Sequence, residues 1–329
     1  LSLHDALPIL EIEKMISIRG ESIIMRSLIK NILNKNNSLR EIAHKANNRF
    51  MRILVRISPV LASKYIYKVV TGKKLNLNSP QDFNEKLQWL KLFWQHPLVA
   101  KCADKYGVRS YVKECNCEEI LNELHGVYEN PNEINWNELP QKFVLKTTNG
   151  CDTNIIVRDK GKLDKEEASN KLNEWLKIDF GLIFAEIHYS KMSPRIICER
   201  FLETKSGLLP NDYKVFCFNG EPKLLYVGVV ENGYTHKTFY DLEWNKLDFL
   251  KKGYKSYDHE KPSCLDDMVR YARILARPFP MVRIDFYDIN GVPKLGEMTF
   301  TPTGGLANYY KDEVLKMMGD WIKLPDKIV

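Results

Sequence analysis

The sequence predicts an α+β fold, and three observations support this class. Patterns of alternating apolar and polar residues, typical of β-strands, begin near residue 142, and amphipathic helical patterns lie around them in no repeating order. Two Asn-Gly pairs, Asn219-Gly220 and Asn290-Gly291, stand between such strand patterns and favour tight hairpin turns. No internal repeat or low-complexity tract is found.

Length and composition restrict the class of protein. The 329 residues suffice for one large domain or for two to three smaller ones, and 44% hydrophobic residues can build a core. The most apolar stretch, residues 51–70, contains four Lys or Arg residues, so no run of eighteen apolar residues predicts a transmembrane helix. We also find no pattern of a signal peptide.

The seven cysteines form no Cys-x-x-Cys pair, and the seven histidines form no His-x-x-x-His pair. Zinc sites and disulfide frameworks are therefore poor interpretations. Reduced thiols in a cytoplasmic protein explain these cysteines better.

The net charge of +7 is concentrated near the N-terminus. Residues 10–74 contain fourteen Lys or Arg residues against four Asp or Glu residues, so the rest of the chain is close to neutral. A near-neutral folded part does not suit a nucleic-acid platform, and we predict no nucleic-acid partner.

The first nine residues, LSLHDALPI, look like translated sequencing-adapter sequence, and we expect a non-native leader there. Met15, Met25 or Met51 would each serve as a native start. Residues 16–70 are basic and carry apolar residues at helical spacing. Two interpretations stay open: a solvated helix that packs on the domain, or a surface helix attracted to an anionic membrane.

The remaining elements are predicted in order along the chain. A helix is expected to start at Ser79-Pro80. Its apolar face is formed by Phe83, Leu87, Leu90 and Trp94. A second helix spans residues 104–113, with Asp104 as its N-cap. Strands are expected within residues 142–159, 195–203, 212–230 and 282–299, and helices at 165–177 and 264–277.

The last hairpin carries charged residues that a hairpin does not need. In VRIDF, residues 282–286, alternation directs Arg283 and Asp285 to one face, while Glu297 and Thr299 share a face of the returning strand. Two acids that face each other repel unless a cation lies between them, and Mg²⁺ prefers such hard oxygen ligands. Arg283 would hold a phosphate or carboxylate. The alternative is a surface hairpin with scattered charges.

A shared metal ion places a condition on the turn. A two-residue turn at Asn290-Gly291 would send Asp285 and Glu297 to opposite faces. We therefore predict an odd-numbered loop of three or five residues centred on Gly291. Pro293 favours such a loop, because it cannot donate a ladder hydrogen bond.

An upstream loop favours phosphate binding. In FVLKTTNGCDTN a strand pattern ends at Lys146, and a small loop with Thr148 and Gly150 follows. Such a lysine can neutralise phosphates while backbone N–H groups of the loop close over them. Lys214 is a second candidate, although either lysine alone more often marks a strand edge. The GxxxxGK[ST] motif is absent.

Six blocks, in order, resemble the TupA-like ATP-grasp family of bacterial cell-surface polysaccharide biosynthesis. They are LNSPQDFNEKLQWLKL, ADKYGVRSYV, LPQKFVLKTTNGCDTNIIVRDK, RIICERFLE, DYKVFCFNGEPKLLY and LGEMTFTPTGG. The resemblance implies an ATP-grasp fold, in which two α+β subdomains clasp ATP. We expect five segments: a leader (1–9), a basic helical region (10–74), a helical domain (75–140), the small ATP-grasp subdomain (141–205) and the core subdomain with the metal site (206–329).

The resemblance also implies roles for the matched residues. The residues implied to bind ATP are Lys105, Lys146, Thr148, Gly150, Glu199, Arg200, Phe201, Leu202, Asp212 and Lys214. Within this set, Glu199 to Leu202 form the hinge that binds adenine, and Asp212 holds the ribose. Arg283 and Lys214 are the implied catalytic residues. The implied magnesium ligands are Asp285, Glu297 and Thr299, the last in a position where the family usually has asparagine.

The implied reaction joins a carboxylate to an amine. ATP phosphorylates the carboxylate to an acyl phosphate, the amine attacks, and an amide forms with release of phosphate. A uronic acid and an amino acid or amine are the expected substrates, carried on a glycan or lipid-linked glycan in the cytoplasm or at the inner face of the membrane. The alternatives are a glycosyltransferase, against which the lack of an Asp-x-Asp motif argues, and a non-catalytic nucleotide-binding partner of the polysaccharide machinery.

Overall fold

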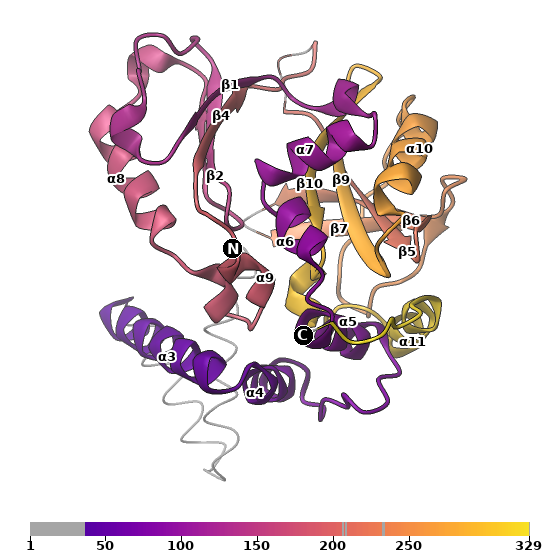
Figure 1. The fold of residues 1–329 in the computed structure, drawn as a ribbon. Helices are drawn as coiled ribbons and strands as arrows, with labels where there is room; N and C mark the ends of the chain where they lie inside the picture. Colours follow the sequence, from indigo (N-terminus) through magenta and orange to yellow (C-terminus); the bar gives the residue numbers. More distant parts are fainter. Residues whose placement is uncertain (1–36, 206, 208, 232–233, 329) are drawn as a thin grey trace.

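The computed structural model describes residues 37–205, 207, 209–231 and 234–328 of the protein. This part of the chain contains two antiparallel sheets that lie side by side, each with a helix on its outer face (Figure 1). The mixture of sheets and helices confirms the predicted α+β class. No helix among these residues is long and apolar enough to cross a membrane.

The first sheet has four strands in the order β1-β4-β2-β3. They are β1 (Leu124–Tyr128), β2 (Phe143–Thr147), β3 (Asn154–Val157) and β4 (Ile196–Arg200). In β2, Phe143 and Leu145 are buried beneath α8 (Lys165–Leu176), whereas the alternate residue Lys146 projects from the other face. The predicted strands and the helix at 165–177 are confirmed here, and β1 joins them from the segment expected to be helical.

The second sheet has six strands in the order β10-β9-β5-β6-β7-β8. They are β5 (Asp212–Phe218), β6 (Glu221–Glu231), β7 (Tyr234–Tyr240), β8 (Lys246–Leu247), β9 (Met281–Ile289) and β10 (Val292–Thr299). Helix α10 (Leu265–Ala276) covers one face, on which Val282, Ile284 and Phe286 are fully buried. The residues between them project from the opposite face, as the alternation predicts.

The described residues contain seven further α-helices. They are α3 (Asn37–Ile57), α4 (Pro59–Thr71), α5 (Phe83–Phe93), α6 (Pro97–Ala103), α7 (Gly107–Glu114), α9 (Ile187–Ser190) and α11 (Asp312–Trp321). Helices α3 and α4 confirm the helical prediction for residues 37–70, and the apolar positions 23–33 lie outside the described residues.

The predicted start of α5 at Ser79-Pro80 is wrong by a few residues. Asp82 is the N-cap, because its side chain accepts a hydrogen bond from the N–H of Glu85 at 2.9 Å. The Glu85 carboxylate accepts a 2.8 Å hydrogen bond from the N–H of Gln81, which holds the preceding residues in a loop. The predicted apolar face of this helix is buried.

Candidate active site

The turn between β9 and β10 differs from the prediction. Ile289 pairs with Val292, so the turn contains only Asn290 and Gly291, and the predicted odd-numbered loop is wrong. Asn290 and Gly291 have φ values of 55° and 86°, the left-handed backbone that a two-residue hairpin turn of this type requires.

A β-bulge nevertheless brings the two acids to one face. Gly296 is one extra residue in β10, so Glu297 pairs directly with Asp285, and Thr299 pairs with Arg283. A shift of one residue moves every following side chain to the other face. Arg283, Asp285, Glu297 and Thr299 therefore share one face as predicted, although the bulge rather than the turn causes it.

Arg283 joins the members of this group. Its guanidinium donates two 2.7 Å hydrogen bonds to the two oxygens of Asp285, a bidentate pair. It also donates to Glu297 Oε1 at 3.2 Å and to Thr299 Oγ1 at 3.0 Å. Asp285 is almost completely buried, so this pairing compensates a charge that water cannot reach.

Lys214 extends the network to the next strand. It pairs with Asp285 across β5 and β9, and its Nζ lies 2.6 Å from Asp285 Oδ2. It also forms an ion pair with Asp212, two residues earlier in β5. Three strands thus present three acids and two cations on one face of the sheet.

The two outer acids differ in pKa because they have different neighbours. Burial raises the pKa of Asp212, and the Asp285 charge adds to this, so that the pKa reaches about 6 despite Lys214. Burial also raises the pKa of Glu297, but the charges of Lys105, Arg283 and Lys214 outweigh it and lower the pKa to about 2. Glu297 is therefore ionised at every physiological pH.

A magnesium ion fits this face only together with other ligands. Among residues 37–328 as described, no group of three or more His, Cys, Asp or Glu residues could hold a metal ion. Asp285 and Glu297 supply two carboxylates, with the Thr299 hydroxyl beside them, and both Asp285 oxygens already accept hydrogen bonds from Arg283. The protein thus offers few ligands, as is usual where phosphates and water complete the coordination of Mg²⁺.

A cavity of about 170 Å³ lies where the two sheets meet. The first sheet contributes Val144 and Lys146, the segment after β4 contributes Phe201 and Leu202, and the second sheet contributes Tyr287. Apolar and aromatic walls with two cations, Lys146 and Arg200, suit a flat, uncharged ring joined to an anionic group. Three of the four predicted hinge residues, Arg200, Phe201 and Leu202, line this cavity.

Glu199 is held by two cations at the edge of the first sheet. Lys146 Nζ lies 2.8 Å from Glu199 Oε2, and Arg109 of α7 lies 3.3 Å from Oε1. The Lys146 pairing follows from the register, because Glu199 lies opposite Val144, two residues before Lys146 on the same strand face. The structure thus brings together Lys146 and Glu199, two residues of the predicted site, and adds Arg109.

Two residues of the predicted phosphate-binding loop, Thr148 and Gly150, make contacts within the protein. Thr148 is buried, and its hydroxyl accepts a 3.2 Å hydrogen bond from the N–H of Arg195. A Cβ at Gly150 would lie 2.3 Å from the ring of Phe180, so only glycine fits there. Lys105 Nζ donates to the carbonyl oxygen of Gly150 and thereby links α6–α7 to this loop.

Helix α5 fixes the loop that follows β10, Pro302–Gly305. Gln88 Nε2 donates to the carbonyl oxygens of Gly304 and Gly305 at 2.8 and 2.9 Å. Lys91 Nζ donates to the carbonyl oxygen of Phe184 at 2.7 Å, and Asn84 exchanges two hydrogen bonds with Ala307. These three polar residues are all buried, although they lie on a helix predicted from its apolar face.

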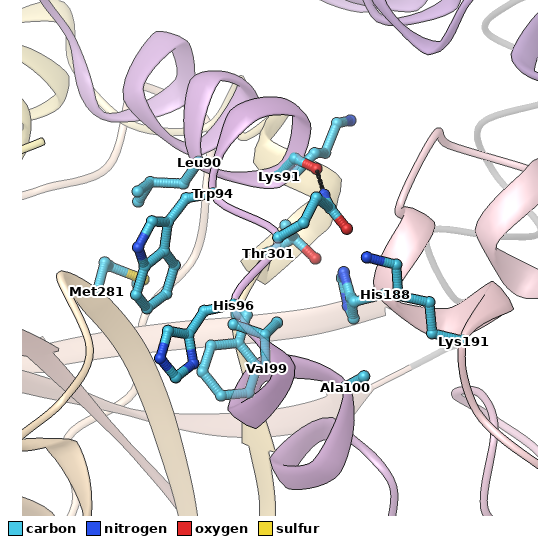
Figure 2. Close-up of a pocket in the computed structure, with 12 residues that line it drawn as sticks. Leu90, Lys91, Trp94, His96, Val99, Ala100, His188, Lys191, Met281 and Thr301 are labelled. Carbon is cyan, nitrogen blue, oxygen red and sulfur yellow. Dashed lines mark hydrogen bonds between the residues drawn. The ribbon is translucent and has the colours of Figure 1, made fainter. Parts of the chain in front are cut away.

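A second cavity, of about 20 Å³, lies between helices α5, α6 and α9 and residues Phe300 and Thr301, which precede this loop (Figure 2). It is about the size of one water molecule and too small for a substrate. His188 lines it, and His188 Nε2 has no hydrogen-bond partner among the described residues. Burial and the charges of Lys91 and Lys191 lower the pKa of His188 to about 3, so the imidazole is neutral.

Sequence reasoning missed three residues of this region: Arg109, Gly296 and Lys237, which projects from the same face in β7. An isolated glycine within a strand pattern is a known signal for a bulge and would have identified Gly296. Arg109 and Lys237 have no local signal, because their positions depend on how distant elements pack.

Solved structures with a similar fold include the D-alanine–D-alanine ligase from Bacillus anthracis complexed with ATP, with 10% identity, a TM-score of 0.38, and coverage of 61% of this chain and 55% of that one. A second is the N5-carboxyaminoimidazole synthase from Aspergillus clavatus in complex with ADP and 5-aminoimidazole ribonucleotide. Its identity is 11%, its TM-score is 0.38, and the match covers 61% of this chain and 45% of that one. The search of curated proteins found no significant match.

The sequence profile of one family, described as TupA-like ATPgrasp, matches residues 85–323, which is well over half of the chain. The matched part includes both sheets, the cavity between them and the ion network on β5, β9 and β10. The chain belongs to the TupA-like ATP-grasp family.

Proposed function

We propose that this protein is an ATP-dependent carboxylate–amine ligase that acts in bacterial cell-surface polysaccharide biosynthesis. The observation that carries the proposal is the ion network in which Asp285 and Glu297 face the same side as Lys214 and Arg283. Hard oxygen ligands beside fixed cations suit the phosphates and Mg²⁺ of a phosphoryl-transfer site.

ATP would lie between the two sheets. Its adenine would occupy the cavity lined by Phe201 and Leu202, with the hinge backbone and Glu199 near its polar edge. The ribose would approach Asp212. Lys146 and Lys214 would then neutralise phosphate charge, together with Lys105 and the backbone of the Thr148–Gly150 loop.

Magnesium would bind through Asp285 and Glu297, with Thr299 directly or through water, and would neutralise negative charge on the phosphates when bound. Arg283 would then move part of its hydrogen bonding from Asp285 to the transferring phosphoryl group. These residues position and neutralise charge, which is the main requirement for this transfer.

In the proposed reaction the substrate carboxylate attacks the γ-phosphorus of ATP, and ADP leaves. An amine then attacks the carbonyl carbon of the acyl phosphate, phosphate leaves with the bonding electron pair, the nitrogen releases one proton to water or to the departing phosphate, and an amide remains. We infer a uronic acid as the carboxylate and an amino acid or amine as the nucleophile. This inference of substrates and of a polysaccharide role rests on the family resemblance.

An ADP-release assay over a panel of uronic acids and amines, with Mg²⁺ and ATP, tests the proposal. We expect ADP release that needs both substrates and falls at least about a hundredfold in Asp285→Asn, a loss typical for a charge-stabilising group. The control is Asp266→Asn, an exposed acid on α10. MgATP binding without turnover on any pair would support a non-catalytic nucleotide-binding partner instead, and sugar transfer from a nucleotide sugar would support a glycosyltransferase.

We further propose that α3 and α4 attach the protein to the inner face of the anionic cell membrane. At their junction Phe50, Ile53, Ile57 and Leu61 are exposed, with Ile57 73% exposed. The exposed cations nearby are Arg49, Arg56, Lys64 and Lys68. Apolar residues surrounded by basic ones suit an anionic lipid surface.

Co-sedimentation with liposomes tests this attachment. The protein should pellet with anionic vesicles, be released by salt, and lose binding in Ile57→Asp. Val230→Asp, at an equally exposed site on β6, is the matched control and should still bind. Equal binding to neutral vesicles, or no binding to either, would leave only the packing role for these helices.

A further inference from the structure

Lys237 projects from the same face of the second sheet as the ion network. It lies in β7 opposite Gly228, and two residues further along, Phe239 lies opposite Tyr226. Tyr226 in turn lies opposite Lys214. Directly paired residues and residues two apart share a face, so Lys237 stands on the Lys214 face, two strands further from β9.

Unlike its neighbours on this face, Lys237 has aromatic contacts in place of an acid. Its Nζ lies 4.7 Å from the ring centre of Tyr309 and 5.9 Å from that of Tyr226. Among the residues that the structure describes, no carboxylate lies within 4 Å of it, whereas Lys214 pairs with two acids. Cation–π contacts offset only part of the charge, which leaves Lys237 available to an anion.

Lys237 also opens onto a cleft of about 440 Å³ at the far edge of the sheet. The cleft is lined by further lysines, including Lys251 and Lys252, and by the rings of Phe249 and Tyr254. Its acid, Asp248, is already paired with Lys311 at 2.6 Å. Of the lining lysines, Lys246 and Lys251 form ion pairs with Asp258 and Asp312, whereas Lys237 and Lys252 have no carboxylate partner among the described residues. The lining therefore keeps an excess of positive charge and has a volume that suits a small ligand.

Lys237 and Tyr309 connect the cleft with the loop that follows β10. Tyr309, whose ring lies under Lys237, is hydrogen-bonded at 3.2 Å to Thr303 in the loop that directly follows β10. Lys237 and Lys214 lie on the same face of the sheet, two strands apart, and Arg283 projects from that face in β9. Burial lowers the pKa of Lys237 to about 8, and positive charge from Arg283 and Lys214 adds to this. A ligand in the cleft could thus extend its anionic end toward Arg283.

We propose that this cleft binds the acidic sugar substrate, with Lys237 holding the carboxylate that is to be activated and Tyr254 contacting the sugar ring. The inference rests on the proposed ligase function and assigns its carboxylate site. This role of Lys237 differs from the proposed roles of Lys146 and Lys214, which bind the phosphates of the nucleotide. Lys252 adds long-range attraction at the mouth of the cleft.

Binding of D-glucuronate to the full chain tests the proposal, with D-glucose as the matched probe that lacks the carboxylate. The variants are Lys237→Met, which keeps the packing over the tyrosines, Lys237→Arg, which restores charge, and Lys252→Met. Lys223→Met, an exposed lysine on β6, is the control. Calorimetry measures glucuronate and MgATP separately, and thermal unfolding checks that each variant folds.

We expect glucuronate binding to weaken at least tenfold in Lys237→Met and about threefold in Lys252→Met, to recover in Lys237→Arg, and to be unchanged in Lys223→Met. MgATP affinity should stay within twofold, and D-glucose should not bind. Equal binding of both sugars, or none, would overturn the proposal.

A loss of MgATP affinity in Lys237→Met with glucuronate unchanged would also overturn it, because Lys237 would then contact phosphate. Glucuronate binding is measured without ATP, so the outcomes are separable from failure of the ligase proposal. A protein that bound glucuronate through Lys237 but failed to bind MgATP would contradict the ligase function, whereas the proposal that the cleft binds an acidic sugar would stand.

Discussion

At the scale of single residues, Gly296 decides which way Glu297 points. The turn at Asn290-Gly291 alone would direct Glu297 away from Asp285, and the one extra residue reverses this. A Cβ at Gly296 would lie 3.1 Å from the ring of Tyr287 and 3.2 Å from the carbonyl oxygen of Asp285. The bulge is therefore built around a residue without a side chain.

Substitution at Gly296 should disturb the site in proportion to side-chain size. Gly296→Ala requires shifts of a few tenths of an ångström, whereas Gly296→Val must displace the Tyr287 ring or the Asp285 backbone. We expect a loss of about 1–3 kcal/mol in the free energy of unfolding for valine, less for alanine, and a fall in ADP release of tenfold or more. Full activity of the valine variant would contradict this account of the bulge.

His188 should give stability an identifiable pH dependence. The folded protein keeps His188 neutral down to a pKa of about 3, whereas the unfolded chain binds the proton near pH 6.5. The unfolded state therefore holds more protons between these values, and stability falls as the pH falls from 6.5 toward 3. Unfolding by urea at pH 5 and pH 8 should show a loss of about 2 kcal/mol from this group.

The variant His188→Gln removes the titration and should reduce that pH dependence by the same amount. His125→Gln, in β1, is the control, since its side chain is only half-buried. If His188→Gln kept the full difference between pH 5 and pH 8, another group would be responsible.

At the scale of elements, α5 does more than cover the sheet with apolar residues. Asn84, Gln88 and Lys91 recur at spacings of four and three, so they lie along one side of the helix. All three hydrogen-bond to carbonyl oxygens of other segments, two of them around the loop that follows Thr299. The helix therefore fixes the backbone next to the proposed site of reaction.

Gln88→Leu tests this role of α5. Leucine keeps most of the volume but leaves the carbonyl oxygen of Gly305 without the Gln88 donor and that of Gly304 with only the 3.5 Å contact from Lys91. We expect a cost of about 1–3 kcal/mol in stability and a fall in kcat larger than any change in the KM for ATP. Gln141→Leu, at an exposed glutamine, should change neither quantity, and equal effects of both variants would contradict the proposed role.

At the scale of the whole molecule, the two sheets meet at the cavity lined by Lys146 and Tyr287, and each would hold one side of the nucleotide. A ligand that contacts both sheets adds its binding free energy to the stability of the fold. Lys146 and Arg200 are the charged residues of the first sheet that line this cavity, and Lys146 is paired only with Glu199 among the described residues.

MgATP should therefore raise the unfolding temperature, with stabilisation of about 2.7 kcal/mol at a concentration one hundred times Kd. Lys146→Met should lose most of this shift, because it weakens phosphate binding at least about tenfold. The control Lys162→Met changes an exposed lysine at the surface. Thermal scans over a range of MgATP concentrations measure both, and an unchanged shift in Lys146→Met would exclude it from the phosphate site.

The sequence by itself determined most strands, most helices and the family, because these depend on local patterns. Strands β1, β7 and β8 lie outside the predicted strand segments. Alternation in β9 predicted which residues are buried against α10, since the direction of a side chain in a strand is a local property. The same alternation correctly placed Arg283 beside Asp285. The segment boundaries and the individual roles of the site residues stay predictions.

Tertiary structure decided what meets across the molecule. Glu297 lies opposite Asp285 because of the Gly296 bulge. A longer turn and an extra residue within the strand have the same effect on the side chains that follow, so the sequence did not distinguish them. The pairing of Arg109 with Glu199 and the stacking of Lys237 on Tyr309 join residues 90 and 72 positions apart in the sequence. Such contacts arise when separate elements pack together, and no local pattern of residues records them.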